Sequence, residues 1–135
     1  MMVSTKGRYA LRVMIDLAEQ DQAGYIPSRD IARRQGISEK YLESILTALT
    51  KAGLLTGVRG KGGGYQLARP LATYHVGEII RAVEDSIAPV SCLEKGAECP
   101  NAGQCRSLPV WQGLEDVVNK YLDGVSLEGL TQRDV

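Results

Sequence analysis

Hydrophobic residues recur along the first third of the chain with the spacing of helices that each bury one face. Over residues 4–21 the apolar side chains return every three or four positions, which predicts an amphipathic helix. Two shorter segments, residues 29–35 and 38–52, show the same period. Gly36 between them and Gly53 after them are turn and stop signals. This part of the chain therefore predicts three consecutive helices.

After the third helix the pattern changes from helical to extended. Residues 54–59 and 65–68 are short strand candidates around the glycine-rich segment GKGGG, which predicts a β-hairpin. Another helix is predicted over residues 76–85, and a long one runs from Pro109 to about Leu122. The expected fold class is therefore mainly α with a small β wing.

The segment SRDIARRQGISEKYLESIL predicts a helix-turn-helix, in which the second helix enters the major groove of DNA. Ala32 is small enough for a close crossing of the two helices, and Ser28 and Ser38 stand where N-caps are expected. An ordinary helical hairpin with a solvated polar face is the alternative. The candidate DNA-binding residues of this segment, all on its polar side, are Ser28, Ser38, Lys40, Tyr41 and Glu43.

Arg59 and Lys61 flank glycines in the predicted hairpin, where they can approach a phosphate backbone or a minor groove. The charge distribution favours such a contact. The chain has no net charge, but residues 1–70 carry 11 Lys/Arg and 6 Asp/Glu, whereas residues 71–135 carry 5 and 10. The N-terminal half is therefore +5, which favours binding of a polyanion. The glycines do not match a nucleotide-phosphate loop.

Three cysteines, Cys92, Cys99 and Cys105, follow one another as C-x6-C-x5-C in a loop over residues 86–107, and the chain has no others. Thiolates gathered in one loop suit an iron–sulfur cluster or zinc. Zinc favours closer cysteine pairs, which are absent here. We therefore expect an iron–sulfur cluster, [2Fe-2S] in preference to [4Fe-4S]. Zinc, another metal, and metal-free thiol redox chemistry stay as alternatives.

The long final helix carries a second apolar pattern. Its hydrophobic residues alternate in steps of three and four, which suits packing against another helix. We expect this seam to form a homodimer, because a helix-turn-helix protein gains affinity and site length by doubling. Packing of the helix on its own domain is the alternative. The seam consists of Trp111, Leu114, Val118, Tyr121 and Val125.

Other classes of protein fit the sequence poorly. No apolar run approaches the roughly 18 residues that span a membrane, and the first residues lack the pattern of a signal peptide. An odd cysteine count argues against a disulfide framework. We therefore expect a cytoplasmic protein with no membrane partner. We also expect no enzyme, since the sequence offers no catalytic set of Ser, His, Cys or acidic residues.

The segments STKGRYALRVMIDLA, SRDIARRQGISEKYLESIL, LLTGVRGKGGGYQLARP and VGEIIRAVE precede the three-cysteine loop and its following tryptophan. This combination resembles the IscR–NsrR–CymR family of bacterial winged-helix transcription regulators over essentially the whole chain. The resemblance implies a homodimer with a long C-terminal dimerisation helix that binds palindromic promoter DNA. In the IscR-like and NsrR-like branches it also implies an iron–sulfur cluster on the three loop cysteines, which CymR-like members lack. The residues at the family's DNA-reading positions are Ser38, Lys40, Tyr41, Glu43 and Arg59.

The sequence departs from this family at both known positions of a fourth cluster ligand. The IscR-like branch has a histidine where this chain has Leu108, and the NsrR-like branch has an aspartate where it has Arg8. Two other functions stay open. One is a cluster-free regulator of cysteine or sulfur metabolism that uses thiol redox or a protein partner, and the other is an iron–sulfur carrier.

We expect three parts in the chain. Residues 1–85 form a winged helix-turn-helix DNA-binding domain, residues 86–107 a cysteine-rich loop, and residues 108–135 a dimerisation helix with a C-terminal tail.

Overall fold

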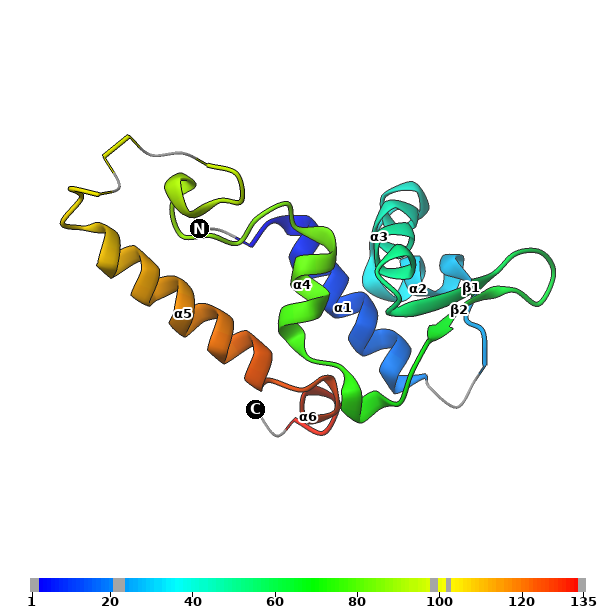
Figure 1. Cartoon of the computed structure of the whole chain (residues 1–135). Helices are drawn as coiled ribbons and strands as arrows, with labels where there is room; N and C mark the ends of the chain where they lie inside the picture. The colour runs from blue at the N-terminus through cyan, green and yellow to red at the C-terminus, as the bar shows by residue number, and fades with distance from the viewer. Residues whose placement is uncertain (1–2, 21–23, 98–99, 102, 134–135) are drawn as a thin grey trace.

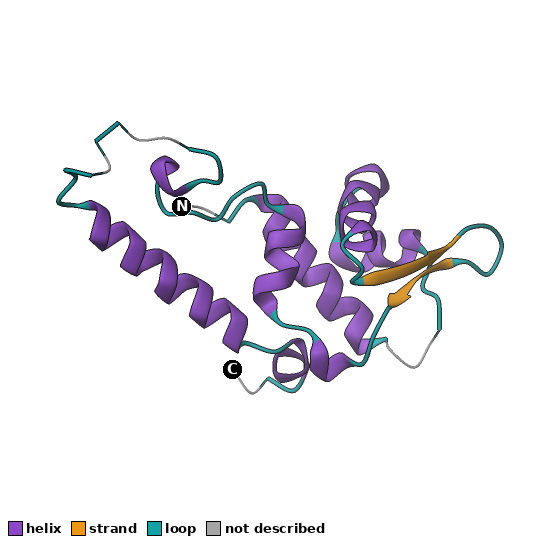
Figure 2. Cartoon of the chain, in the orientation of Figure 1, coloured by secondary structure: helices purple, strands orange, loops and turns teal. Residues whose placement is uncertain are grey.

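The computed structural model describes residues 3–20, 24–97, 100–101 and 103–133. It confirms a mainly α-helical chain with a small antiparallel sheet (Figure 1, Figure 2). In the described residues, no helix has the length and apolar character needed to cross a membrane. In chain order the elements are α1 (Thr5–Glu19), α2 (Ser28–Gln35), α3 (Glu39–Lys51), β1 (Leu55–Val58), β2 (Gly64–Leu67), η2 (Leu71–Thr73), α4 (Val76–Val83), η3 (Ser91–Leu93), α5 (Leu108–Gly124) and α6 (Leu127–Thr131).

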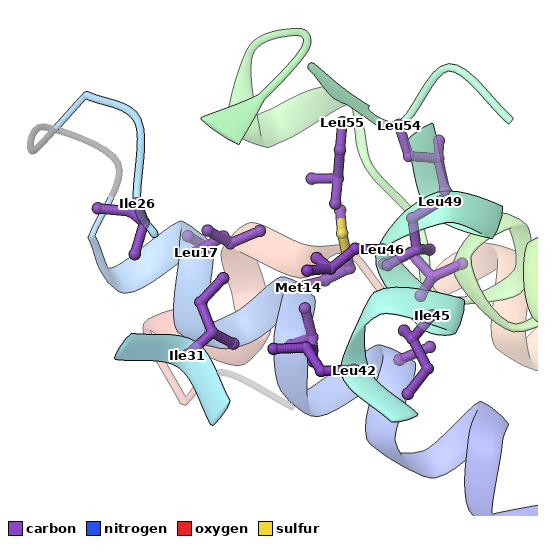
Figure 3. Close-up of a cluster of buried hydrophobic side chains, with 14 of the residues drawn as sticks. Met14, Leu17, Ile26, Ile31, Leu42, Ile45, Leu46, Leu49, Leu54 and Leu55 are labelled. Carbon is purple, nitrogen blue, oxygen red and sulfur yellow. The ribbon is translucent and has the colours of Figure 1, made fainter. Parts of the chain in front are cut away.

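The hydrophobic core is built around α1, which contacts α2, α3, α4 and α6. Met14 and Leu17 of α1 share this core with Leu42 and Leu46 of α3, and all four side chains are fully or almost fully buried (Figure 3). Full burial of one such side chain contributes about 1.5–3 kcal/mol. Side chains from α1, α2 and α3 therefore hold the three N-terminal helices together as one unit.

The starts of α2 and α3 differ in a way that the sequence did not reveal. The Ser38 hydroxyl caps α3, as predicted, by accepting a hydrogen bond from the amide three residues later at 3.1 Å. The prediction that Ser28 caps α2 is wrong. The Pro27 carbonyl already accepts hydrogen bonds from the amides of Asp30 and Ile31, so Ser28 is the first helical residue.

The wing consists of β1 and β2, which pair antiparallel with Val58 opposite Gly64. Tyr65 of β2 also exchanges two hydrogen bonds with Ile26, at 2.9 and 2.8 Å, on the segment that leads into α2. A Cβ atom on Gly64 would collide with the Ile26 carbonyl. Glycine at this position therefore lets the wing lie directly against the entry to the helix-turn-helix.

A buried tyrosine holds the base of the wing. The Tyr74 hydroxyl donates to the Leu54 carbonyl at 2.7 Å and accepts from the amides of Ala68 and Arg69 at 2.9 and 3.2 Å. Its side chain is fully buried. Since Leu54 precedes β1 and Ala68 follows β2, this one hydroxyl joins the two ends of the hairpin.

The C-terminal segment returns to the core after the long helix α5 (Figure 1). The Val76 amide donates to the Val125 carbonyl at 2.9 Å, and the Leu127 amide donates to the Tyr74 carbonyl at 3.0 Å. Leu127 is fully buried, and α6 packs against α1 and η2. Helix α6 was not predicted from the sequence, and its burial fixes the C-terminal end of α5 on the N-terminal half of the chain.

Candidate nucleic-acid interface and cysteine loop

The helix-turn-helix forms as the sequence predicted. Gly36 adopts the left-handed conformation with φ of 67°, and the Ile37 amide donates to the Ala32 carbonyl at 3.1 Å. Ala32 is buried where α2 and α3 meet. Close approach at Ala32 and the sharp turn at Gly36 together orient α3 with its N-terminal end exposed.

Most of the predicted DNA-binding side chains are accessible. Lys40, Glu43 and Ser38 are exposed at the N-terminal end of α3, and Ser28 is half-buried at the start of α2. In the wing, the segment between β1 and β2 exposes both of its cations, Arg59 and Lys61. None of the three cations named here has an ion-pair partner among the described residues.

Tyr41 is placed differently from the expectation that it faces outward. Its side chain is half-buried, and its ring meets the Tyr9 ring of α1 edge to face at a centroid distance of 5.9 Å. The Arg12 guanidinium lies 5.0 Å from the centroid of the Tyr9 ring. Tyr41 is therefore only partly exposed, because α1 supplies an aromatic surface that the sequence of α3 does not show. Tyr41 links α3 to α1.

An ion pair with a buried carboxylate, which was not predicted from the sequence, attaches α2 to α1. Asp16 is 4% exposed and accepts two hydrogen bonds from Arg34, at 2.9 and 2.7 Å, and one from Gln35 at 2.8 Å. The hydrogen bond to Asp16 raises the pKa of Arg34. The sequence did carry a sign of this burial, because Asp16 follows Val13 by three residues and so lies on the apolar side of the first helix.

A groove separates α3 from the wing. Its larger part is a pocket of about 540 Å³ that adjoins the start of α2, with Glu39 and Glu43 on one wall and Arg59 and Lys61 on the other. Ser28 also lines it. The structure therefore gathers four of the sequence-predicted candidates, from three different elements, around one concave surface.

The cysteine loop lies at the opposite end of the molecule from the wing (Figure 1). Cys92 is in η3 and Cys105 precedes α5; both are half-buried free thiols. Cys99 lies outside the described residues. No group of three or more described His, Cys, Asp or Glu residues is arranged to hold a metal ion, and Cys99 is not part of that comparison.

The surroundings of Cys105 favour its thiolate form. Its Sγ lies 3.2 Å from the Ser107 hydroxyl, and the backbone around Ser107 and Leu108 adds further hydrogen bonds to the sulfur. The Ser107 hydroxyl is the largest cause that lowers the pKa of Cys105. Thiolate is the form in which cysteine binds metals and reacts with oxidants, so this side chain is suited to both chemistries.

Polar contacts join α4 to the C-terminal end of α5. Arg81 donates to Asp123 at 2.7 and 3.2 Å and to Asn119 at 2.8 Å. The hydrogen bond from Arg81 lowers the pKa of Asp123. A Cβ atom on Gly77 would collide with the Asp123 carboxylate, so the bare backbone of α4 at Gly77 is what lets the two helices approach. The cysteine loop therefore connects two helices that already contact each other.

The predicted apolar seam of α5 divides between two faces of the helix. Trp111, Val118 and Val125 are half-buried in their own chain, whereas Leu114 and Tyr121 are 37% and 63% exposed. Two further apolar residues that the sequence analysis did not include complete the exposed stripe at helical spacing. This exposed stripe consists of Val110, Leu114, Val117 and Tyr121.

Comparison with known proteins places the chain in a family of regulators. A sequence profile described as Rrf2, an iron-dependent transcriptional regulator, matches residues 3–133. The chain belongs to the Rrf2 family. The HTH-type transcriptional regulator IscR of Escherichia coli (strain K12 / DH10B) is 40% identical over 127 residues, which cover 94% of this chain and 78% of that relative.

Solved structures of Rrf2 relatives share the fold. T. potens IscR is 35% identical with a TM-score of 0.79, and the alignment covers 100% of this chain and 89% of that one. CymR, the global cysteine regulator of B. subtilis, is 37% identical with a TM-score of 0.78 and 98% coverage of both chains. This Rrf2 protein is thus a transcription regulator of the IscR type with a winged-helix fold, and it is not an enzyme.

Proposed function

We propose that this Rrf2 protein is a homodimeric regulator whose binding to palindromic promoter DNA responds to an iron–sulfur cluster held by Cys92, Cys99 and Cys105. The observation that carries the proposal is the pair of free thiols at Cys92 and Cys105, in the loop that links the helix-turn-helix half of the chain to α5. A change in this loop can alter how two DNA-reading units are placed relative to each other.

The DNA contact that we propose uses the exposed end of α3 and the wing. Lys40 and Arg59 are free cations that attract phosphates, and the +5 charge of residues 1–70 supports them. Glu43 is exposed at a position where its carboxylate can accept a hydrogen bond from a cytosine amino group. Ser28, Ser38 and Lys61 would add polar contacts to the backbone. Tyr41 would act mainly through its packing on α1.

The residues present in the loop fit a cluster. The Ser107 hydroxyl lowers the pKa of Cys105, and the Cys92 thiol is unpaired in the same loop. When bound, an iron–sulfur cluster would supply a redox-active, oxygen-sensitive group between the two parts of the chain. Leu108 carries no donor atom, so the fourth ligand would come from the partner subunit, water or a small thiol. Such a ligand exchanges readily, and we expect a cluster that is labile in air.

The dimer that we propose uses the exposed stripe of α5. Leu114, Val117 and Tyr121 together with Val110 present a continuous apolar row to solvent in the monomer. In a symmetric dimer the same row serves both subunits, and burying it contributes about 25 cal/mol per Å² of apolar surface. A two-fold protein axis matches the two-fold symmetry of a palindromic site.

A second function has its own support. The similarity to the global cysteine regulator CymR is about as strong as the similarity to T. potens IscR, and the lowered pKa of Cys105 suits a thiol that is oxidised directly. In that case the protein would respond to cysteine or sulfur metabolism through thiol redox or a protein partner. An iron–sulfur carrier has less support, because a carrier has no use for the helix-turn-helix and wing.

One experiment separates these functions. The protein is purified without oxygen, its visible absorption is recorded, and its iron and acid-labile sulfide are measured. DNA affinity is then compared between the loaded and the cluster-free protein. The proposal expects iron, sulfide and a visible band that each of Cys92→Ser, Cys99→Ser and Cys105→Ser removes, together with a change in DNA affinity. Protein without iron and sulfide, whose DNA affinity changes with thiol oxidation, would favour the second function.

A further inference from the structure

The groove between α3 and the wing has a second part. Of the DNA-binding residues predicted from the sequence, only Arg59 lines it. It is a pocket of about 340 Å³ with Thr47 and Lys51 of α3 on one side and Gly57 and Arg59 on the other. The ring of Tyr65 lies across Gly57 and belongs to this pocket and to the larger one. The two pockets therefore adjoin and form one channel along α3.

The geometry of a winged-helix contact requires something to pass through this channel. If α3 occupies the major groove and the wing approaches the neighbouring minor groove, the sugar–phosphate strand that separates these grooves must run between α3 and the wing. This step rests on the proposed DNA-binding function. The residues that line the channel then face phosphates as well as bases.

Charge decides which part of the channel accepts a phosphate. At the end near the start of α3, the carboxylates of Glu39 and Glu43 offset two of the three cations that line the pocket, which are Arg29, Arg59 and Lys61. The other end has no carboxylate in its lining. Lys51 and Arg59 line the other end, both are exposed, and neither has an ion-pair partner among the described residues. A phosphate between α3 and the wing is therefore most stable at the Lys51 end.

Two threonines line this pocket, and only one of them has a hydroxyl that is free to donate a hydrogen bond to a phosphate. The Thr50 hydroxyl donates to the Leu46 carbonyl at 2.7 Å, so its proton is already used within α3. Thr47 is exposed, and its hydroxyl has no hydrogen-bond partner in the described part of the chain. Gly57 opposite has no side chain to fill the space.

We propose that Thr47, Lys51 and Arg59 form a binding site for one backbone phosphate of the strand between the major and minor grooves. Lys51 and Arg59 supply charge from opposite walls of the channel, and the Thr47 hydroxyl donates a hydrogen bond. Neutralising the phosphate here fixes the position of α3 along the groove. It leaves the acidic end of α3, with Glu43, opposite base edges rather than phosphates.

The test uses a duplex selected by the full-length protein from a random library, with binding followed by fluorescence anisotropy. Lys51→Ala should flatten the slope of log affinity against log salt by about 0.9, the value for one lost phosphate contact. Lys51→Arg should restore the slope. The matched control is Lys95→Ala, which removes an exposed cation from the cysteine loop, far from the wing.

A second measurement locates the phosphate. Single phosphates of the selected duplex are replaced by neutral methylphosphonates, one at a time. One replacement should weaken binding of the wild-type protein and the Lys95→Ala variant more than binding of Lys51→Ala, because that variant has already lost one of the two cations at the phosphate. An unchanged slope in Lys51→Ala, or equal sensitivity of both proteins at every phosphate, overturns this inference alone. A wild-type protein that selects no duplex overturns the proposed DNA-binding function and this inference with it.

Discussion

The Glu84 carboxylate accepts hydrogen bonds from both the amide and the hydroxyl of Ser4, at 2.8 and 2.6 Å, across 80 positions of sequence. Ser4 is the N-cap of α1, and its hydroxyl also accepts from the Gly7 amide at 3.3 Å. Glu84 directly follows α4 and precedes the cysteine loop. A negative charge at the start of a helix is favourable, so this contact joins the beginning of the loop to α1, the central helix of the core.

Gly7→Ala should destabilise the protein although alanine favours helices. A Cβ atom at this position would collide with the Glu84 carboxylate. To make room, the Glu84 carboxylate must move away from Ser4 and lose two hydrogen bonds. Hydrogen bonds to a charged group contribute about 1.5–3 kcal/mol each, which exceeds the gain of about 1 kcal/mol in helix propensity. Urea unfolding should show the loss, and the loss should be smaller when Gly7→Ala is made in a Glu84→Ala background. Equal losses in the two backgrounds would show that the carboxylate does not exclude the side chain.

Tyr74→Phe should lower the free energy of unfolding by about 1–3 kcal/mol, the cost of leaving buried polar groups unpaired. The change removes one hydroxyl that serves the Leu54 carbonyl and two backbone amides at the base of the wing. Tyr9→Phe is the control, because the Tyr9 hydroxyl has no hydrogen bond among the described residues and its ring contacts are kept. Chemical denaturation of both variants measures the difference, and similar stability of the two would contradict the anchoring role of Tyr74.

The double change Leu114→Glu and Val117→Glu should convert the proposed dimer to a folded monomer. Both side chains are exposed in the chain, Val117 by 65%, so neither change disturbs the core. In a symmetric interface the added carboxylates meet like charges, and burying unpaired charge costs several kcal/mol. Light scattering measures the mass and circular dichroism the helix content. The control is Gln112→Glu, which adds charge on α5 outside the exposed stripe and should leave the dimer intact. A double variant that is still dimeric would show that the stripe is not the interface.

Ser107→Ala should slow the alkylation of Cys105 in the metal-free protein at neutral pH. The Ser107 hydroxyl is the main group that lowers the pKa of Cys105, so its loss raises that pKa and reduces the thiolate fraction. Iodoacetamide labelling followed by mass spectrometry reports the rate for this one cysteine. Ser91→Ala, beside Cys92 but with no such contact among the described residues, is the matched control. Equal rates in the two variants would exclude a role for the Ser107 hydroxyl.

Asp123→Asn should reduce stability at neutral pH and have progressively less effect in acid. Arg81 lowers the pKa of Asp123 below its ordinary value of 3.8. A carboxylate with a lowered folded pKa contributes stability above its unfolded pKa and loses it as the pH falls through the folded value. The gap between wild type and variant should therefore close below about pH 4. Thermal unfolding across this pH range measures the difference in stability between wild type and Asp123→Asn, with Asp116→Asn as control. A difference that does not change with pH would contradict the role of the Asp123 charge.

The sequence by itself determined the local elements and the chemistry that they carry. The apolar period of residues 4–21, the glycine at position 36 and the serine at position 38 act over one or two helical turns. Such signals are readable without the fold, because the helix, its cap and its turn depend on neighbours along the chain. The same holds for the hairpin, the family resemblance and the candidate cysteines.

Only the tertiary structure decided where these elements face and what joins them. Tyr41 is half-buried because Tyr9 lies beside it, and Ser28 does not cap α2 because the Pro27 carbonyl starts that helix. The apolar residues of α5 divided between two faces because α4 covers one of them, through Arg81 and Asp123. Each of these outcomes depends on a partner distant in sequence or on backbone geometry, and hydrophobic periodicity carries no information about either.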